Sequence, residues 1–177
     1  MKRRLENTIE ENLKNNIFWS KIICPDCREQ NAFLAIRDNR IDLYHKGGKL
    51  FSYNKNKFKT HIKYASVITK SEEDKDYISE SELSNHKLAS NFEDNYSRIK
   101  ENCSNYSGIE ALGVSSIYHK HSYLSKNDDI VVLDIEVSFK SLSDEGKQDR
   151  IDILLFNRKT QALQFVEAKH YSNSEIW

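Results

Sequence analysis

Three side chains near the C-terminal end of the chain combine residue types that can cleave a phosphodiester bond. Asp152 lies within the apolar run 151–156, and Glu167 and Lys169 follow the run 162–166. Residues two apart in a strand point to the same face, so Glu167 and Lys169 share one. Two carboxylates can hold a hard cation such as Mg²⁺, which polarises a phosphate and lowers the pKa of a bound water. A neighbouring lysine can orient that water or stabilise the developing charge.

These groups meet only if both runs are strands. The turn residues 157–160 separate the runs, so the pattern predicts a β-hairpin. A buried strand seldom carries a carboxylate without a partner, which favours a functional site. The alternative is a solvated hairpin in which Asp152 and Glu167 pair with Arg150 and Lys169.

Asp152 followed by Glu167-Ala168-Lys169 resembles the signature of the PD-(D/E)XK nuclease superfamily. The resemblance covers residues 86–177 at most, and the proline of the signature is absent. It implies a core of a helix, a three-strand antiparallel meander, a second helix and a last strand. It also implies that Asp152 and Glu167 bind Mg²⁺ or Mn²⁺, that Lys169 is the catalytic lysine, and that DNA, or alternatively RNA, is the substrate.

Two further acids are candidates for the same site. The resemblance implies an extra acid on the helix before the meander, and Glu110 is the candidate. Ser107 and Glu110 also match a capping box, which predicts the start of a short helix there. Glu136 lies on the polar face of the alternating strand 130–139, where it either leans toward the acidic pair or faces solvent.

An amphipathic helix precedes this region, because apolar residues recur at steps of three and four between Leu88 and Tyr106. The strands predicted after it form a three-strand antiparallel meander: 130–139, 148–157 and 161–169. The intervening stretch 114–124 alternates weakly, as a strand does, and includes His119 and His121. We interpret these two histidines as surface residues.

The first seventy residues predict a helix followed by hairpins. Apolar residues recur every four positions and predict a helix over 3–16: Leu5, Ile9, Leu13 and Ile17. The strands predicted after it are 33–36, 41–44, 50–54 and 57–64, with Gly47-Gly48 at a hairpin turn.

Cys24 and Cys27 form a C-x-x-C pair, which is half of a zinc site. Cys103 stands alone, and His45 and His61 are not at the spacing of a zinc finger. We therefore expect a turn centred on the proline between the first two cysteines, with the thiols partly buried, rather than zinc.

Alternation places basic side chains on one face of the strand 57–64: Lys57, Lys59, His61 and Lys63. Lysines and aromatic residues nearby in the sequence are Lys46, Lys49 and Lys55, and Tyr44, Phe51 and Tyr53. This patch can follow a phosphate backbone, or its lysines can protect an edge strand from aggregation; the two interpretations are compatible. The residues predicted to contact nucleic acid are Lys57, Lys59, Lys63, Arg150 and His170.

The composition limits the protein class. The 177 residues include 27 basic and 27 acidic residues, so any attraction to nucleic acid must be local. No run of about 18 apolar residues predicts a membrane helix, and the basic N-terminus lacks the apolar segment of a signal peptide. The odd number of cysteines predicts a cytoplasmic protein.

These patterns predict an α+β protein with three parts: an N-terminal helix and hairpins at 1–70, an acidic linker at 71–85, and a nuclease-like core at 86–177. Ser172 and Glu175 form another capping box, yet the chain stops at Trp177. We therefore expect a fragment of a longer protein, or closure by a neighbouring copy in a homodimer. The predicted function is a metal-dependent nuclease; the alternative is a catalytically inactive module that binds nucleic acid or protein.

Overall fold

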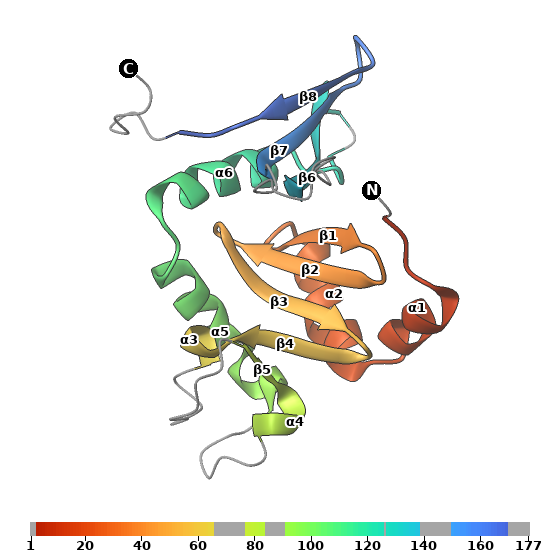
Figure 1. Cartoon of the computed structure of the whole chain (residues 1–177), viewed down its shortest axis with the longest axis vertical. Coiled ribbons are helices and arrows are strands. Elements are labelled where there is room, and N and C mark those ends of the chain that lie inside the picture. The colour runs from red at the N-terminus through yellow and green to blue at the C-terminus, as the bar shows by residue number, and fades with distance from the viewer. Residues whose placement is uncertain (1–2, 66–76, 84–90, 126, 139–149, 170–177) are drawn as a thin grey trace, which may run out of the picture. The chain divides into compact units, whose positions relative to one another are not determined.

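A computed structural model describes residues 3–65, 77–83, 91–125, 127–138 and 150–169 (Figure 1). The fold is α+β and contains two antiparallel sheets, one of five strands and one of three. The chain divides into an N-terminal unit, Lys2–Ser107, and a C-terminal unit, Gly108–Trp177. None of the helices in the described ranges has both the length and the apolar character needed to cross a membrane.

The sheet of the N-terminal unit is a meander in the order β1-β2-β3-β4-β5. Its strands are β1 (Phe33–Arg37), β2 (Arg40–His45), β3 (Gly48–Asn54), β4 (Lys57–His61) and β5 (Tyr77–Ser79). The first four confirm the strands predicted over 33–61. Two-residue turns join β2 to β3 and β3 to β4, and all their residues have positive φ: 45° at Lys46, 85° at Gly47, 49° at Lys55 and 61° at Asn56. This backbone geometry matches the twist of the flanking strands.

The strand predicted over 57–64 ends early, at His61, where the chain turns into the short helix α3 (Ile62–Ala65). The His61 ring accepts a hydrogen bond at its Nδ1 from the backbone N–H of Lys63, 3.0 Å away. Such local side-chain bonds compete with the strand ladder. Lys63 therefore lies on a helix and not on the strand face predicted for it.

Helices cover one face of this sheet: α1 (Asn7–Lys14), the π-helical turn η1 (Trp19–Ile23), α2 (Cys24–Arg28) and α5 (Phe92–Asn105). Phe18 packs edge-on against Phe51 and Phe58, with ring centroids 5.3 and 5.2 Å apart. Phe92 and Tyr96 of α5 complete this aromatic core. Because side chains alternate along β4, the buried Phe58 leaves its two lysine neighbours on the opposite, outer face.

Helix α5 belongs to the N-terminal unit, whereas the sequence predicted it as the start of the C-terminal core. Its Ile99 and Cys103 are fully buried against the five-stranded sheet. The approach is close, since a Cβ atom at Gly48 would lie only 2.5 Å from Cys103 Sγ. An amphipathic stripe shows which side of a helix is buried but not which element covers it.

The boundary between the units also differs from the acidic linker predicted at 71–85. The part of that stretch within the described ranges forms β5 and a short helix, α4 (Glu80–Leu83). Ile78 of β5 is 3 % exposed and joins the core. One apolar residue and pairing with β4 are enough to order this segment despite its acidic neighbours.

Two local predictions near the N-terminus need correction. The first helix is shorter than 3–16, and Ile17, expected on its buried stripe, is 60 % exposed. The segment Cys24–Arg28 is helical rather than a turn. Pro25 lies in the first turn of α2, which continues directly from the π-helical turn η1.

The C-terminal unit consists of α6 (Ile109–Lys120) followed by β6 (Ile130–Ser138), β7 (Arg150–Asn157) and β8 (Ala162–Val166). The strands pair antiparallel in the order β6-β7-β8, which confirms the predicted meander. The third strand is shorter than the predicted 161–169, because β8 ends at Val166, so Glu167 and Lys169 lie beyond it and do not share a strand face. Ile135, Val137 and Ile153 form its buried face.

The stretch 114–124, predicted as a weak strand, is mostly helix α6. The hydroxyls of Ser115 and Ser116 donate to helix carbonyls three residues earlier, a bond that a strand cannot make. Gly108, not Ser107, is the N-cap of α6. Ser107 instead donates its hydroxyl to the carbonyl of Cys103 at the end of α5. The capping box predicted at 172–175 lies outside the described residues.

Candidate functional site

Three acidic residues lie at one level across the C-terminal sheet. The pairs Ile135–Ile153 and Val137–Ile151 of β6 and β7 flank Glu136 and bring it level with Asp152. Glu136 itself has a positive φ of 49°, so its backbone departs locally from the extended strand. The pairing of β7 with β8 ends at Ile153 and Val166, and continuing it by one residue places Glu167 beside Asp152. We call Glu136, Asp152 and Glu167 the carboxylate row. The sequence predicted the last two as ligands and Glu136 as an additional acid.

Local contacts position two members of the row, Asp152 and Glu136. Asp152 Oδ2 accepts a hydrogen bond from the backbone N–H of Ala168 at 2.8 Å, which keeps the chain beside β7 after β8 ends. Arg150, two residues before Asp152 and therefore on its face, places Nη1 3.6 Å from Glu136 Oε1. Glu136 thus faces the same side as Asp152.

The predicted catalytic lysine lies at the end of this row. Lys169 Nζ is 3.4 Å from Glu167 Oε1, and the two side chains are 37 % and 49 % exposed. The Arg150–Glu136 pair is comparably open. Ion pairs at this exposure contribute about 0–1 kcal/mol, so a divalent cation can displace them at little cost.

The chemistry of the donors fits a hard divalent cation. The row offers carboxylate oxygens, the ligands that Mg²⁺ prefers. Asp152 Oδ1 accepts no hydrogen bond from the described residues, so it keeps its lone pairs for an ion. Among those residues, no three His, Cys, Asp or Glu side chains are close enough to share a metal ion as they stand. Metal binding would therefore require Glu136 and Glu167 to turn from their cationic partners toward Asp152.

The other predicted site residues are not joined to this row in the described structure. Glu110 lies exposed in the first turn of α6, with no hydrogen bond or ion pair to Asp152 or Glu167. His119 is in α6, and His121 is its C-cap, so they do not share a strand face. His170 lies outside the described residues.

The three cysteines are free thiols in the N-terminal unit. Burial raises the pKa of Cys27 to about 12 and that of Cys103 to about 12, so both thiols are neutral near pH 7. Zinc binds the thiolate form. The side chains of the two buried cysteines pack in the hydrophobic core, and Cys103 packs against β3.

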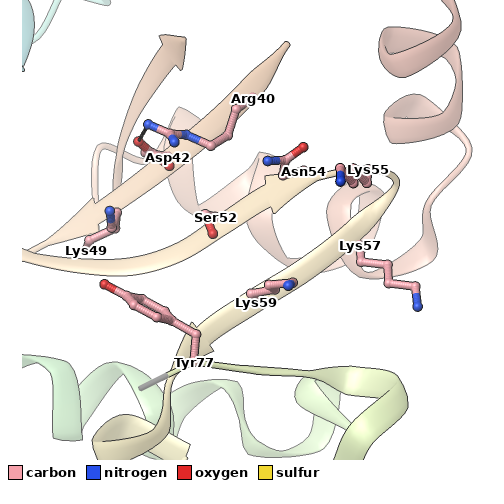
Figure 2. A pocket seen from close by; sticks show the side chains of 9 residues that line it. All are labelled: Arg40, Asp42, Lys49, Ser52, Asn54, Lys55, Lys57, Lys59 and Tyr77. Carbon is pink, nitrogen blue, oxygen red and sulfur yellow. Dashed lines mark hydrogen bonds and ion pairs between the residues drawn. The ribbon is translucent and has the colours of Figure 1, made fainter. Parts of the chain in front are cut away.

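A pocket of about 570 Å³ opens on the outer face of the N-terminal sheet (Figure 2). Its cationic lining residues are Arg40, Lys49, Lys55, Lys57 and Lys59. Asp42, Ser52 and Tyr77 line it as well. We call this the basic pocket. It contains two of the three lysines predicted to contact nucleic acid.

The aromatic member of this pocket was not predicted. The sequence suggested Tyr44, Phe51 and Tyr53, but all three are buried. Tyr77, 45 % exposed, lies there instead. Lys63 on α3 lies with its Nζ 5.9 Å from the Tyr106 ring. The sequence did not point to Tyr77, because it lies within an acidic stretch that was predicted as a linker. Only the alternation Tyr77-Ile78-Ser79 could have indicated a strand there.

No family model, curated protein or solved structure matches this chain. The arrangement of the residues themselves therefore carries the functional argument.

Proposed function

We propose that this protein is a Mg²⁺-dependent nuclease, with DNA the expected substrate and the carboxylate row as its active site. The observation that supports this most is the level arrangement of Glu136, Asp152 and Glu167, with Lys169 two residues beyond the last. The order α6-β6-β7-β8 also supports it, because the resemblance to PD-(D/E)XK nucleases implies a helix followed by a meander.

Each residue of the site has a separate task. Asp152 and Glu167 would hold the ion, with Glu136 as a third oxygen donor. A bound Mg²⁺ supplies a polarised phosphate and a water of lowered pKa. Lys169 donates hydrogen bonds to the attacking water or to a phosphate oxygen, which stabilises the charge that develops there. Arg150, on the same face, binds a neighbouring phosphate as a two-pronged donor.

Cleavage of linear and plasmid DNA in Mg²⁺ or Mn²⁺ tests this assignment. Asp152→Asn and Lys169→Met should each lower the cleavage rate by about 10²–10⁴-fold, because each removes a group that acts on the reacting phosphate. EDTA should abolish cleavage. Lys159→Met is the matched control, since Lys159 is an exposed lysine of the same sheet paired with Asp129 at the hairpin turn. Undiminished cleavage by the Lys169→Met protein would remove the assigned role.

The alternative function is a non-catalytic module that binds nucleic acid or protein. One observation favours it: Glu136 and Glu167 contact Arg150 and Lys169 rather than converging on one point. Calorimetric titration with Mg²⁺ separates the two. A nuclease should bind the ion, and Asp152→Asn should weaken that binding. A protein that binds DNA but neither binds Mg²⁺ nor cleaves is the module.

A further inference from the structure

The basic pocket belongs to the other unit and has a chemistry of its own. Its volume of about 570 Å³ lies in the range of small-molecule sites. Five cationic residues line it against one acid. Lys55, Lys57 and Lys59 form no ion pair within the described ranges, so their charge is not neutralised there. Such a concave, positively charged surface attracts phosphate.

Sheet pairing brings the lining groups together. Asp42 on β2 is opposite Ser52 on β3, which in turn is opposite Lys59 on β4. Tyr77 on β5 pairs with the residue two positions after Lys59 and so joins the same face. Figure 2 shows Tyr77 directed toward Lys49, whose Nζ lies 6.0 Å from the centre of the ring. The pocket therefore combines an aromatic surface with cations beside it.

Asp42 is the feature that phosphate binding alone does not explain. It is 1 % exposed, and its Oδ2 accepts a hydrogen bond from Arg40 Nη2 at 2.9 Å (Figure 2). Arg37 Nε lies 3.6 Å from the same oxygen. The other oxygen, Oδ1, is buried and accepts no hydrogen bond from the described residues. A buried acceptor without a donor is unfavourable, and a ligand that displaces the side chains covering Oδ1 could supply the missing donor.

We propose that the basic pocket binds one nucleotide, with its phosphate on Lys49 and Lys59, its base against Tyr77, and an N–H of the base donating to Asp42 Oδ1. Bases stack on aromatic side chains whatever their identity, and their amino and imino groups match a carboxylate acceptor. In a duplex the neighbouring bases cover the face of the base that would stack on Tyr77, so the nucleotide must be unpaired, either free or one unit of a single strand. The proposal goes beyond the nuclease activity and does not depend on it.

Binding is measured in EDTA, where metal-dependent cleavage cannot occur, with two probes. Fluorescence anisotropy follows a short labelled single strand, and calorimetry follows 5′-mononucleotides. Lys59→Ala and Tyr77→Leu should each raise Kd by about 5–100-fold, since a stacked base or a phosphate contact contributes about 1–3 kcal/mol. Lys59→Ala should also reduce the salt dependence of strand binding by about 0.7 in the log–log slope. Lys14→Ala, which changes an exposed lysine on α1 outside the pocket, should leave Kd unchanged.

The proposed hydrogen bond from the base to Asp42 is tested by comparing ligands with and without a base. Ribose 5-phosphate, which lacks a base, should bind the wild-type protein more weakly than the nucleotide. Asp42→Asn should reduce this preference about tenfold, since a hydrogen bond to a charged group contributes about 1.5–3 kcal/mol. If Asp42→Asn fails to fold, Tyr77→Leu changes a half-exposed side chain and still reports on the preference.

Tighter binding of the strand than of the free nucleotide identifies a nucleic-acid strand as the source, and the reverse identifies a free nucleotide. The proposal is overturned if neither probe binds or if Lys59→Ala and Tyr77→Leu bind like wild type. Preference for duplex, or equal affinity for ribose 5-phosphate and nucleotide, also overturns it. Because binding in EDTA reports on the pocket and cleavage in Mg²⁺ reports on the carboxylate row, the two proposals can fail separately.

Discussion

The two sheets share an antiparallel meander but carry different charged groups. The outer face of the N-terminal sheet carries the basic pocket, whereas the C-terminal sheet carries the carboxylate row. The chain as a whole has no net charge. The zero net charge is therefore the sum of a locally basic surface, which suits phosphate, and a row of carboxylates, which suits a divalent cation. Total charge alone does not exclude a nucleic-acid-binding protein.

The sheets also differ in how they are stabilised. Helices bury one face of the N-terminal sheet around a group of packed aromatic rings. In the C-terminal sheet, β8 carries Leu163 and Phe165, each 53 % exposed. Similar side chains should therefore contribute very different amounts to stability in the two units, and three pairs of measurements can break or sharpen this comparison.

The largest difference is expected between two phenylalanines. Phe51 is fully buried and contacts four aromatic rings, the nearest being Phe92 at 5.1 Å. Phe51→Ala should lower the free energy of unfolding by about 3–5 kcal/mol. The half-exposed Phe165→Ala should lower it by less than about 1 kcal/mol. Urea unfolding followed by circular dichroism measures both. Equal losses would contradict the difference between the units.

The next effect concerns acid. Burial lowers the pKa of His45 to about 4, while its Nδ1 lies 2.8 Å from the carbonyl oxygen of Asn31. In the unfolded chain His45 becomes protonated near pH 6.5, whereas in the folded chain its ring stays neutral down to about pH 4. Between these values the unfolded state binds more protons, so stability is full above pH 6.5 and falls as the pH drops.

At pH 4 the lowered pKa of His45 reduces the free energy of unfolding by up to about 3 kcal/mol relative to pH 7, at 1.36 kcal/mol per pKa unit. His45→Gln keeps an N–H donor for the Asn31 carbonyl and does not titrate. We therefore expect this variant to lose less stability than wild type between pH 7 and pH 4, measured by urea unfolding across that range. Parallel pH profiles for the two proteins would show that His45 is not the source.

The smallest expected difference in stability is between variants of two ion pairs that have almost the same N–O distance. Lys100 Nζ lies 2.7 Å from Asp26 Oδ2 with both side chains mostly buried, and Lys159 Nζ lies 2.6 Å from Asp129 Oδ2 in solvent. Lys100→Met should cost about 1–3 kcal/mol, because it leaves the buried Asp26 carboxylate with fewer donors. Lys159→Met should not change the melting temperature measurably. A larger loss from the exposed pair would reverse the comparison.

The sequence by itself determined most of the strands, with β5 and the stretch 114–124 as exceptions. Alternation is a local property, so Phe58 between two lysines, and Asp152 before the buried Ile153, already indicate which residues face the core. The predicted meander then follows because strands that are consecutive in the chain usually pair with each other. This is why the sequence could predict Asp152, Glu167 and Lys169 as neighbours, whereas alternation alone left Glu136 either beside them or facing solvent.

Only the tertiary structure decided what each element packs against. The stripe of α5 predicted a buried face, but its contacts with Phe51 and Gly48 placed it in the N-terminal unit. The basic pocket likewise needs Asp42, Lys59 and Tyr77, which come from three strands and meet only through sheet pairing. Local periodicity fixes the direction of a side chain, whereas its partners depend on contacts that no local pattern encodes.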